Sequence, residues 1–294
     1  MRCSGENKHG MRRHWLGCAL LASIAGVVIL SSAHAQAHSE KSGAANSQRQ
    51  PAAASIEQGQ PLEIDPNAPV DMKRRALTSR AAVYEAAGDF AAAEADFAAA
   101  LALAPVDPAL YAARGYFYLR TKRFGDALED FLTGARLDPA NPRYPFAAGR
   151  LQATRGNYSA AIVFYDQALR LNPRDASYLL ARGEAHVRLA KLAEARADYD
   201  SAIAIGLTRP NDRYFAYLGR GYIGLVTRDY SHAASDFDQA LAVEPDAINA
   251  LLWRGYAREK GGRADLALAD YERAVAADPK DAWARANLRR LRSN

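Results

Sequence analysis

Two side-chain types of opposite charge, arginine and aspartate, recur together along the chain. In five segments an arginine precedes a small residue, and an aspartate precedes an aromatic residue at a constant distance downstream. A guanidinium and a carboxylate can form two parallel hydrogen bonds, which fix geometry rather than transform a substrate. The predicted structural ion pairs are Arg80 with Asp96, Arg114 with Asp130, Arg182 with Asp198, Arg220 with Asp236 and Arg254 with Asp270.

One further segment lacks both charges and carries Ala148 and Phe164 in the corresponding places. The alternative to pairing is two independent rows of surface charge inherited with the repeat. Loss of both charges in the same segment favours direct pairing, with an apolar contact as the replacement. Because removing one partner of a partly buried pair strands the other, we expect the energetics of each pair to be coupled.

Residue patterns that indicate catalysis are missing from the sequence. It contains no glycine-rich phosphate loop, no HExxH, no GxSxG and no paired-cysteine motif. His186 and His232 stand in different segments, and His186 occupies an aromatic position, where a packing role is expected. The cysteines, Cys3 and Cys18, both lie near the N-terminus. We therefore predict no enzymatic activity, no cofactor and no metal site.

The elements that must position these residues are helices repeated every 34 residues. The markers Gly115, Ala127, Phe131 and Pro139 are followed one period later by Gly149, Ala161, Tyr165 and Pro173. A fixed period of this size is typical of a stacked helical array. Each unit is expected to hold two helices, the first capped by a residue such as Asp107, Asn141 or Asp175, and the second ended by proline.

These glycine or alanine, alanine, aromatic and proline columns resemble the tetratricopeptide repeat (TPR) family over about 206 residues, from Arg74 to Pro279. The resemblance implies an all-α fold, a right-handed superhelical solenoid of six helix–turn–helix units. Gly115 and Ala127 are expected to face each other where two helices cross. The predicted units lie near 74–107, 108–141, 142–175, 176–213, 214–247 and 248–281, with a loop through Asp212 after the fourth and a capping helix at 282–292.

In this family the first helices line a concave groove, and helical phase selects the residues of this chain that would face it. The predicted partner-binding groove contains Tyr116, Leu119, Phe146, Arg150, Glu184, Arg188, Phe215, Leu218, Tyr222, Leu252 and Tyr256. An apolar and aromatic groove with a few charges suits an extended or helical peptide. The alternative is that some of these residues pack against neighbouring helices.

The N-terminal 35 residues are similar to a secretory signal. Arg12 and Arg13 precede an apolar run from Trp15 to Leu30, and Ala33-His34-Ala35 offers a small-x-small cleavage pattern. An uncleaved membrane anchor is the alternative. Residues 36–70, rich in Ala, Ser, Gln, Gly and Pro, are predicted to form a flexible linker to the solenoid at 71–294.

The composition adds little in favour of a nucleic-acid partner. The formal charge is +5 over 294 residues, but the leader carries four basic residues and one acidic residue, and the remaining 34 basic and 32 acidic residues leave +2. The leading hypothesis is a periplasmic or secreted adaptor that binds a protein or peptide partner during assembly of an envelope complex. The alternatives are a membrane-anchored scaffold that self-associates and a module associated with carbohydrate or polymer.

Overall fold

The computed structural model describes residues 63–293, and all regular elements in this range are helices. The all-helical fold class is therefore confirmed. The predicted leader and residues 36–62 of the predicted linker lie outside the described residues. The thirteen helices of the described range are α3 (Val70–Ala87), α4 (Phe90–Leu103), α5 (Pro108–Arg120), α6 (Phe124–Leu137), α7 (Arg143–Thr154), α8 (Tyr158–Leu171), α9 (Ala176–Arg188), α10 (Leu192–Ile205), α11 (Pro210–Val226), α12 (Tyr230–Val243), α13 (Ile248–Lys260), α14 (Ala264–Ala277) and α15 (Ala282–Arg292).

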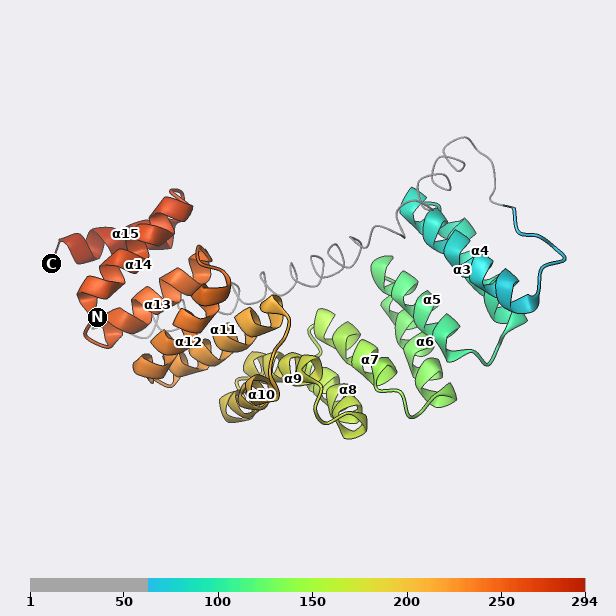
Figure 1. The fold of residues 1–294 in the computed structure, drawn as a ribbon, viewed down its shortest axis with the longest axis horizontal. Coiled ribbons are helices and arrows are strands. Elements are labelled where there is room, and N and C mark those ends of the chain that lie inside the picture. The colour runs from blue at the N-terminus through green and yellow to red at the C-terminus, as the bar shows by residue number, and fades with distance from the viewer. Residues whose placement is uncertain (1–62, 294) are drawn as a thin grey trace, which may run out of the picture. The chain divides into compact units, whose positions relative to one another are not determined.

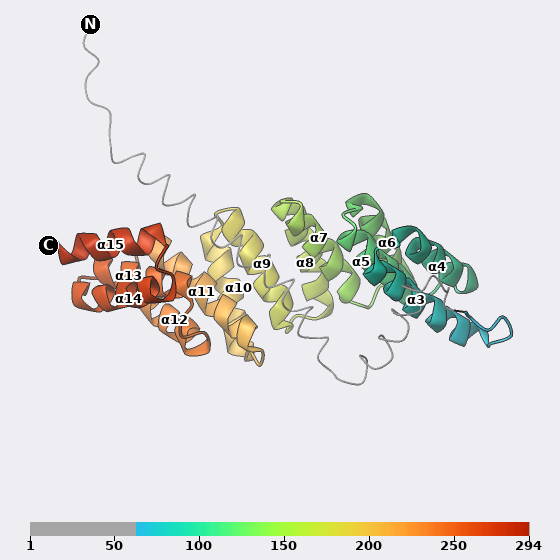
Figure 2. The same cartoon turned by 90° about the horizontal axis from the view of Figure 1, so that it is seen from above.

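The described helices fall into two compact units, α3 to α11 and α12 to α15. In the first unit, successive helices form the hairpins α3/α4, α5/α6, α7/α8 and α9/α10, and α11 packs against α10 and α9 (Figure 1). The second helix of each of these hairpins also contacts the first helix of the next element. In the second unit, α13 pairs with α14, while α12 covers α13 and α15 covers α14 (Figure 2). Each hairpin thus buries its apolar faces against its neighbours, as expected for a repeat array.

The helix ends follow from short polar side chains and from prolines. Asp107 accepts a hydrogen bond from the Ala109 amide, Asp175 from the Ser177 amide and Asp281 from the Ala284 amide, so three first-turn amide groups are satisfied. The structure corrects the predicted loop through Asp212, because α11 already begins at Pro210. Proline is favourable at the first helical position, and an ion pair of 2.7 Å between Arg209 Nε and Asp212 Oδ2 closes this first turn.

Small residues allow the helices to approach closely, and aromatic rings pack against them. A Cβ atom added at Gly115 would lie 2.9 Å from the Phe131 ring, so this glycine packs against the ring of the second helix. A Cβ atom at Gly134 would lie 2.8 Å from the ring of Tyr144 on the next hairpin. The first contact sets the spacing within a hairpin, and the second sets the spacing between hairpins.

We predict that Gly149→Ala destabilises the protein by about 1–2 kcal/mol, despite the higher helix propensity of alanine. The new Cβ atom would lie 2.6 Å from the buried Tyr165 ring and 3.2 Å from the Ala161 carbonyl oxygen. Gly125→Ala is the matched control, since nothing lies within 4 Å of its added Cβ atom. Urea denaturation should show opposite signs for the two variants; a stabilising Gly149→Ala would contradict the packing argument.

Candidate functional site

Four of the predicted arginine–aspartate pairs lie within hairpins, and each forms a bidentate ion pair. Arg80 Nε and Nη2 donate to the two Asp96 carboxylate oxygens, both at 2.7 Å. The equivalent bonds are 2.9 and 2.8 Å between Arg114 and Asp130, and each of these aspartates is buried. Arg182 with Asp198 and Arg254 with Asp270 have the same arrangement. Each pair therefore ties the first helix of a hairpin to the second.

The residues of the fifth predicted pair, Arg220 and Asp236, lie in different compact units, and this pair stays a prediction. Within the first unit, Arg220 Nη1 donates to Asp200 at 2.7 Å. This carboxylate belongs to the preceding hairpin, so the arginine connects two successive elements of the array.

The same connection recurs and was missed in the sequence. Arg182 Nη1 donates to Asp166 and Arg254 Nη1 donates to Asp238, both at 2.6 Å. Asp166, Asp200 and Asp238 each directly follow the aromatic residue of the second helix, while the corresponding residues of the first two hairpins are Ala98 and Leu132. The change from apolar residues to aspartate along this column was the available signal in the sequence. The hydrogen bonds show that these arginines join successive elements of the array as well as the helices within a hairpin.

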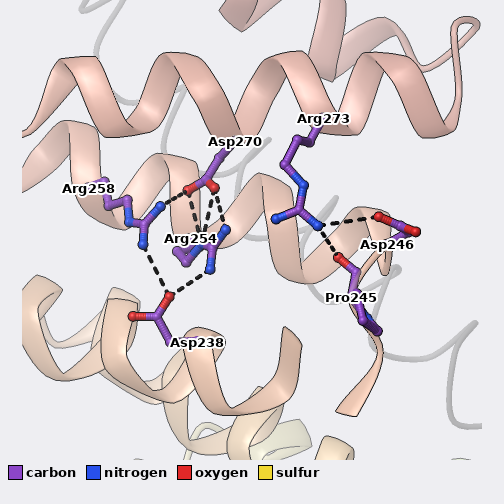
Figure 3. A network of polar contacts seen from close by, with 7 residues as sticks. All are labelled: Asp238, Pro245, Asp246, Arg254, Arg258, Asp270 and Arg273. Atoms are coloured by element: carbon purple, nitrogen blue, oxygen red, sulfur yellow. Dashed lines mark hydrogen bonds and ion pairs between the residues drawn. The ribbon is translucent and has the colours of Figure 1, made fainter. Parts of the chain in front are cut away.

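In the last hairpin the ion pair becomes a closed network of four residues (Figure 3). Arg258 donates to Asp270 at 2.9 Å and to Asp238 at 3.1 Å, while Arg254 binds the same two carboxylates. Nearby, Arg273 Nη2 donates to the Pro245 carbonyl oxygen at 2.7 Å. Asp270 is only 1% exposed, so the two guanidinium groups replace its lost hydration.

The predicted groove residues divide into two sets. Leu218, Tyr222 and Leu252 are buried, with exposed fractions of 4%, 5% and 4%, so the prediction that they present a binding surface is wrong. Helices in a stacked array contact neighbours on more than one side, and the large apolar side chains at these positions are covered. The others are at least partly exposed: Tyr116, Leu119, Phe146, Arg150, Glu184, Arg188, Phe215 and Tyr256.

Aromatic contacts hold several of these exposed positions in place. The Tyr116 ring meets Phe131 edge-on at 5.1 Å, and the Phe146 ring lies 4.4 Å from Tyr178 and 5.7 Å from Tyr165. Arg150, by contrast, is exposed and makes no side-chain hydrogen bond or ion pair with the described part of the chain. The first helices α5, α7 and α9 thus present a fixed aromatic surface with a freely accessible cation.

Glu184 is the exceptional charged residue of this surface. It lies on α9, and its charge acts on the buried Tyr165 of α8 and Tyr199 of α10. Burial raises the pKa of Glu184 to about 7, and the positive charge of Arg188 offsets this only in part. Burial likewise raises the pKa of both tyrosines, and the Glu184 charge adds to the effect. We call the partly exposed residues Phe146, Glu184 and Arg188 the Glu184 subsite.

His186 faces the ion pair of its hairpin rather than a catalytic partner. It is buried, its Nε2 lies 3.8 Å from Asp198 Oδ2, and its Nδ1 has no hydrogen-bond partner in residues 63–293. His186 therefore packs in the interior as predicted, but one of its ring nitrogens is left without a hydrogen bond in this range. Burial lowers the pKa of His186, so the ring is neutral near pH 7.

Residues 63–293 offer neither a metal site nor a membrane span. In this range His, Cys, Asp and Glu side chains nowhere gather in the groups of three that a metal ion would require. Nor does any helix of the same range have the length and apolar character needed to cross a bilayer.

Several solved structures have similar folds. PilF of Pseudomonas aeruginosa matches with a TM-score of 0.61 and 16% identity, covering 76% of this chain and 98% of its own. PilW, described as a widely conserved type IV pilus biogenesis factor, matches with a TM-score of 0.59 and 18% identity over 73% of this chain and 98% of its own. YrrB, described as a TPR protein with an unusual peptide-binding site, matches with a TM-score of 0.56 and 17% identity over 65% of this chain and 96% of its own.

Family models match directly at the level of sequence. A tetratricopeptide repeat model covers residues 79–142 and 218–282, and a TPR repeat model covers residues 149–189. These matches span more than half of the chain and fall on the helical hairpins described above. The chain belongs to the tetratricopeptide repeat family.

Proposed function

We propose that this protein is a non-catalytic adaptor that binds a polypeptide partner along the exposed face of its first helices. One observation carries the proposal: α5, α7 and α9 together present partly exposed aromatic side chains and charged groups at equivalent positions. Aromatic anchors combined with a few charges are the chemistry by which grooves bind peptides. The peptide-binding site named for YrrB supports this reading.

We further propose that the adaptor acts outside the inner membrane, in assembly of an envelope complex. The support is the signal-like leader in the sequence and the role named for PilW in pilus biogenesis. The predicted domain order, a leader of residues 1–35, a linker to residue 70 and the repeat array, belongs to this proposal. Recovery of an exported chain that begins at Gln36 would support it, and retention of residues 1–35 would favour the anchored scaffold.

The test is site-specific photocrosslinking in the native envelope. A photoreactive residue replaces Arg150 on α7 or, as the matched control, Val163 on α8, which is 56% exposed. We expect one protein partner to be crosslinked from position 150 and not from position 163. Both sites are exposed, so a difference between them reports which face binds rather than which residue is accessible.

Three results would contradict the adaptor proposal in different ways. Equal crosslinking from both positions would mean that the first-helix face is not the binding surface. Crosslinks solely between copies of the chain would favour a self-associating scaffold. Crosslinks solely to cell-wall polymer would favour the carbohydrate-associated alternative.

A further inference from the structure

Glu184 differs from the other partly buried carboxylates of the first compact unit in having no partner. Asp96, Asp130 and Asp198 bind arginines, Glu85 binds Arg120, and Glu94 binds both Tyr118 and Arg123. No hydrogen bond or ion pair to Glu184 is formed by residues 63–293. Desolvating a carboxylate without supplying donors is unfavourable, and this explains its raised pKa.

The nearest cation does not fill this role. Arg188 lies one turn further along α9 and donates from Nε to the Tyr158 hydroxyl at 3.1 Å. Its guanidinium carbon also lies over the Tyr158 ring, 5.2 Å from the centroid. Arg188 is therefore held toward α8, and it lowers the pKa of Glu184 without forming a hydrogen bond to it.

The surroundings of Glu184 define the chemistry of a complementary group. Tyr165 packs among Ala161 and Ala185, with Phe146 and Ala181 beside this cluster. Of these residues, Phe146 on α7 and Ala181 on α9 are partly exposed, and they form the accessible aromatic and apolar wall near the Glu184 carboxyl, which has no donor within the described range. A long alkyl stem ending in a cation matches both features, because the stem can cover the wall while the charge reaches the carboxylate. A single carboxylate supplies too few ligands to hold a metal ion.

We propose that the Glu184 subsite binds a lysine or arginine side chain of the partner polypeptide. This inference rests on the adaptor function and specifies which residue type the groove selects. The carboxylate pairs with the ammonium or guanidinium group, and the partly exposed Phe146 contacts the aliphatic stem. Arg150, exposed on the preceding first helix, disfavours a second cation next to the first.

The test uses short degenerate peptide pools that differ at one fixed central position. The position holds lysine, arginine or the uncharged isostere norleucine, and binding is measured by fluorescence polarisation at about pH 8, where Glu184 is ionised. We expect at least one basic pool to bind about tenfold more tightly than the norleucine pool. Glu184→Gln should abolish this preference. Glu129→Gln, which removes an exposed charge on α6, is the matched control and should retain it.

The remaining outcomes separate this inference from the adaptor function. If all pools bind equally and Glu184→Gln changes nothing, the groove binds peptides but the cation subsite is refuted. If no pool binds, both the subsite and peptide binding by the groove are refuted. A preference confined to lysine or to arginine supports the subsite and identifies the partner's side chain.

Discussion

Replacing Arg182 by alanine is expected to lower the free energy of unfolding by about 3 kcal/mol, more than replacing Asp198 does. Without Arg182 the Asp198 carboxylate, only 5% exposed as a side chain, loses the bonds from Nε and Nη2. Without Asp198, Arg182 still donates to Asp166 at 2.6 Å and reaches solvent. The two single variants are expected to lose different amounts of stability because the aspartate is the more buried partner.

The double-mutant cycle tests whether this is pairing. Arg182→Ala with Asp198→Ala should be more stable than Arg182→Ala alone, since the stranded carboxylate is gone. A sharper control copies the third hairpin, where Ala148 and Phe164 replace the pair. Arg182→Ala with Asp198→Phe should recover most of the lost stability in urea denaturation. Strictly additive single changes would refute the coupling.

The pKa of His186, measured by NMR, distinguishes the loss of a charge from the loss of packing in these variants. Burial and the positive charge of Arg182 both lower the pKa of His186, whereas Asp198 raises it. In Arg182→Ala the stranded carboxylate remains 3.8 Å from His186 Nε2. The pKa of His186, followed by NMR, should therefore rise in this variant and fall back in the double variant.

The sequence predicted the features that the repeat itself specifies. A column of small residues beside a column of aromatics requires two closely crossing helices, so the hairpins and the register of Arg182 with Asp198 could be inferred. Joint loss of both charges at Ala148 and Phe164 was informative for the same reason. These properties depend on how far apart the residue types stand within the repeat, and that separation is visible in the sequence.

Properties that depend on how hairpins stack were not predictable in this way. Tyr222 and Tyr116 occupy equivalent positions, yet Tyr222 is buried and Tyr116 is partly exposed, and the repeat pattern does not distinguish them. The contact of Arg182 with Asp166 crosses between hairpins and was missed. Glu184 was selected as a groove residue from helical phase, but its lack of a partner emerges only from the three-dimensional arrangement.

Glu184→Gln is expected to stabilise the protein at alkaline pH and to leave its stability unchanged at acid pH. Folding raises the pKa of Glu184 from its ordinary value of 4.5 to about 7. Between these values the folded state binds more protons than the unfolded state, so stability falls as pH rises. The shift corresponds to a loss of about 3 kcal/mol above about pH 7, as an upper bound, and to none below about pH 4.

The measurement is the difference in unfolding free energy between Glu184→Gln and the wild type across this pH range. His186 contributes the opposite slope, because its pKa is lowered and the unfolded state takes up its proton first as pH falls below about 6.5. Subtracting the two proteins cancels that contribution, since both retain His186. A difference that does not change with pH would mean that Glu184 is well hydrated, and it would remove the basis of the cation subsite. A difference that grows between about pH 4.5 and about pH 7 would mean that the unliganded groove keeps a carboxylate desolvated, and a bound cation would relieve that cost.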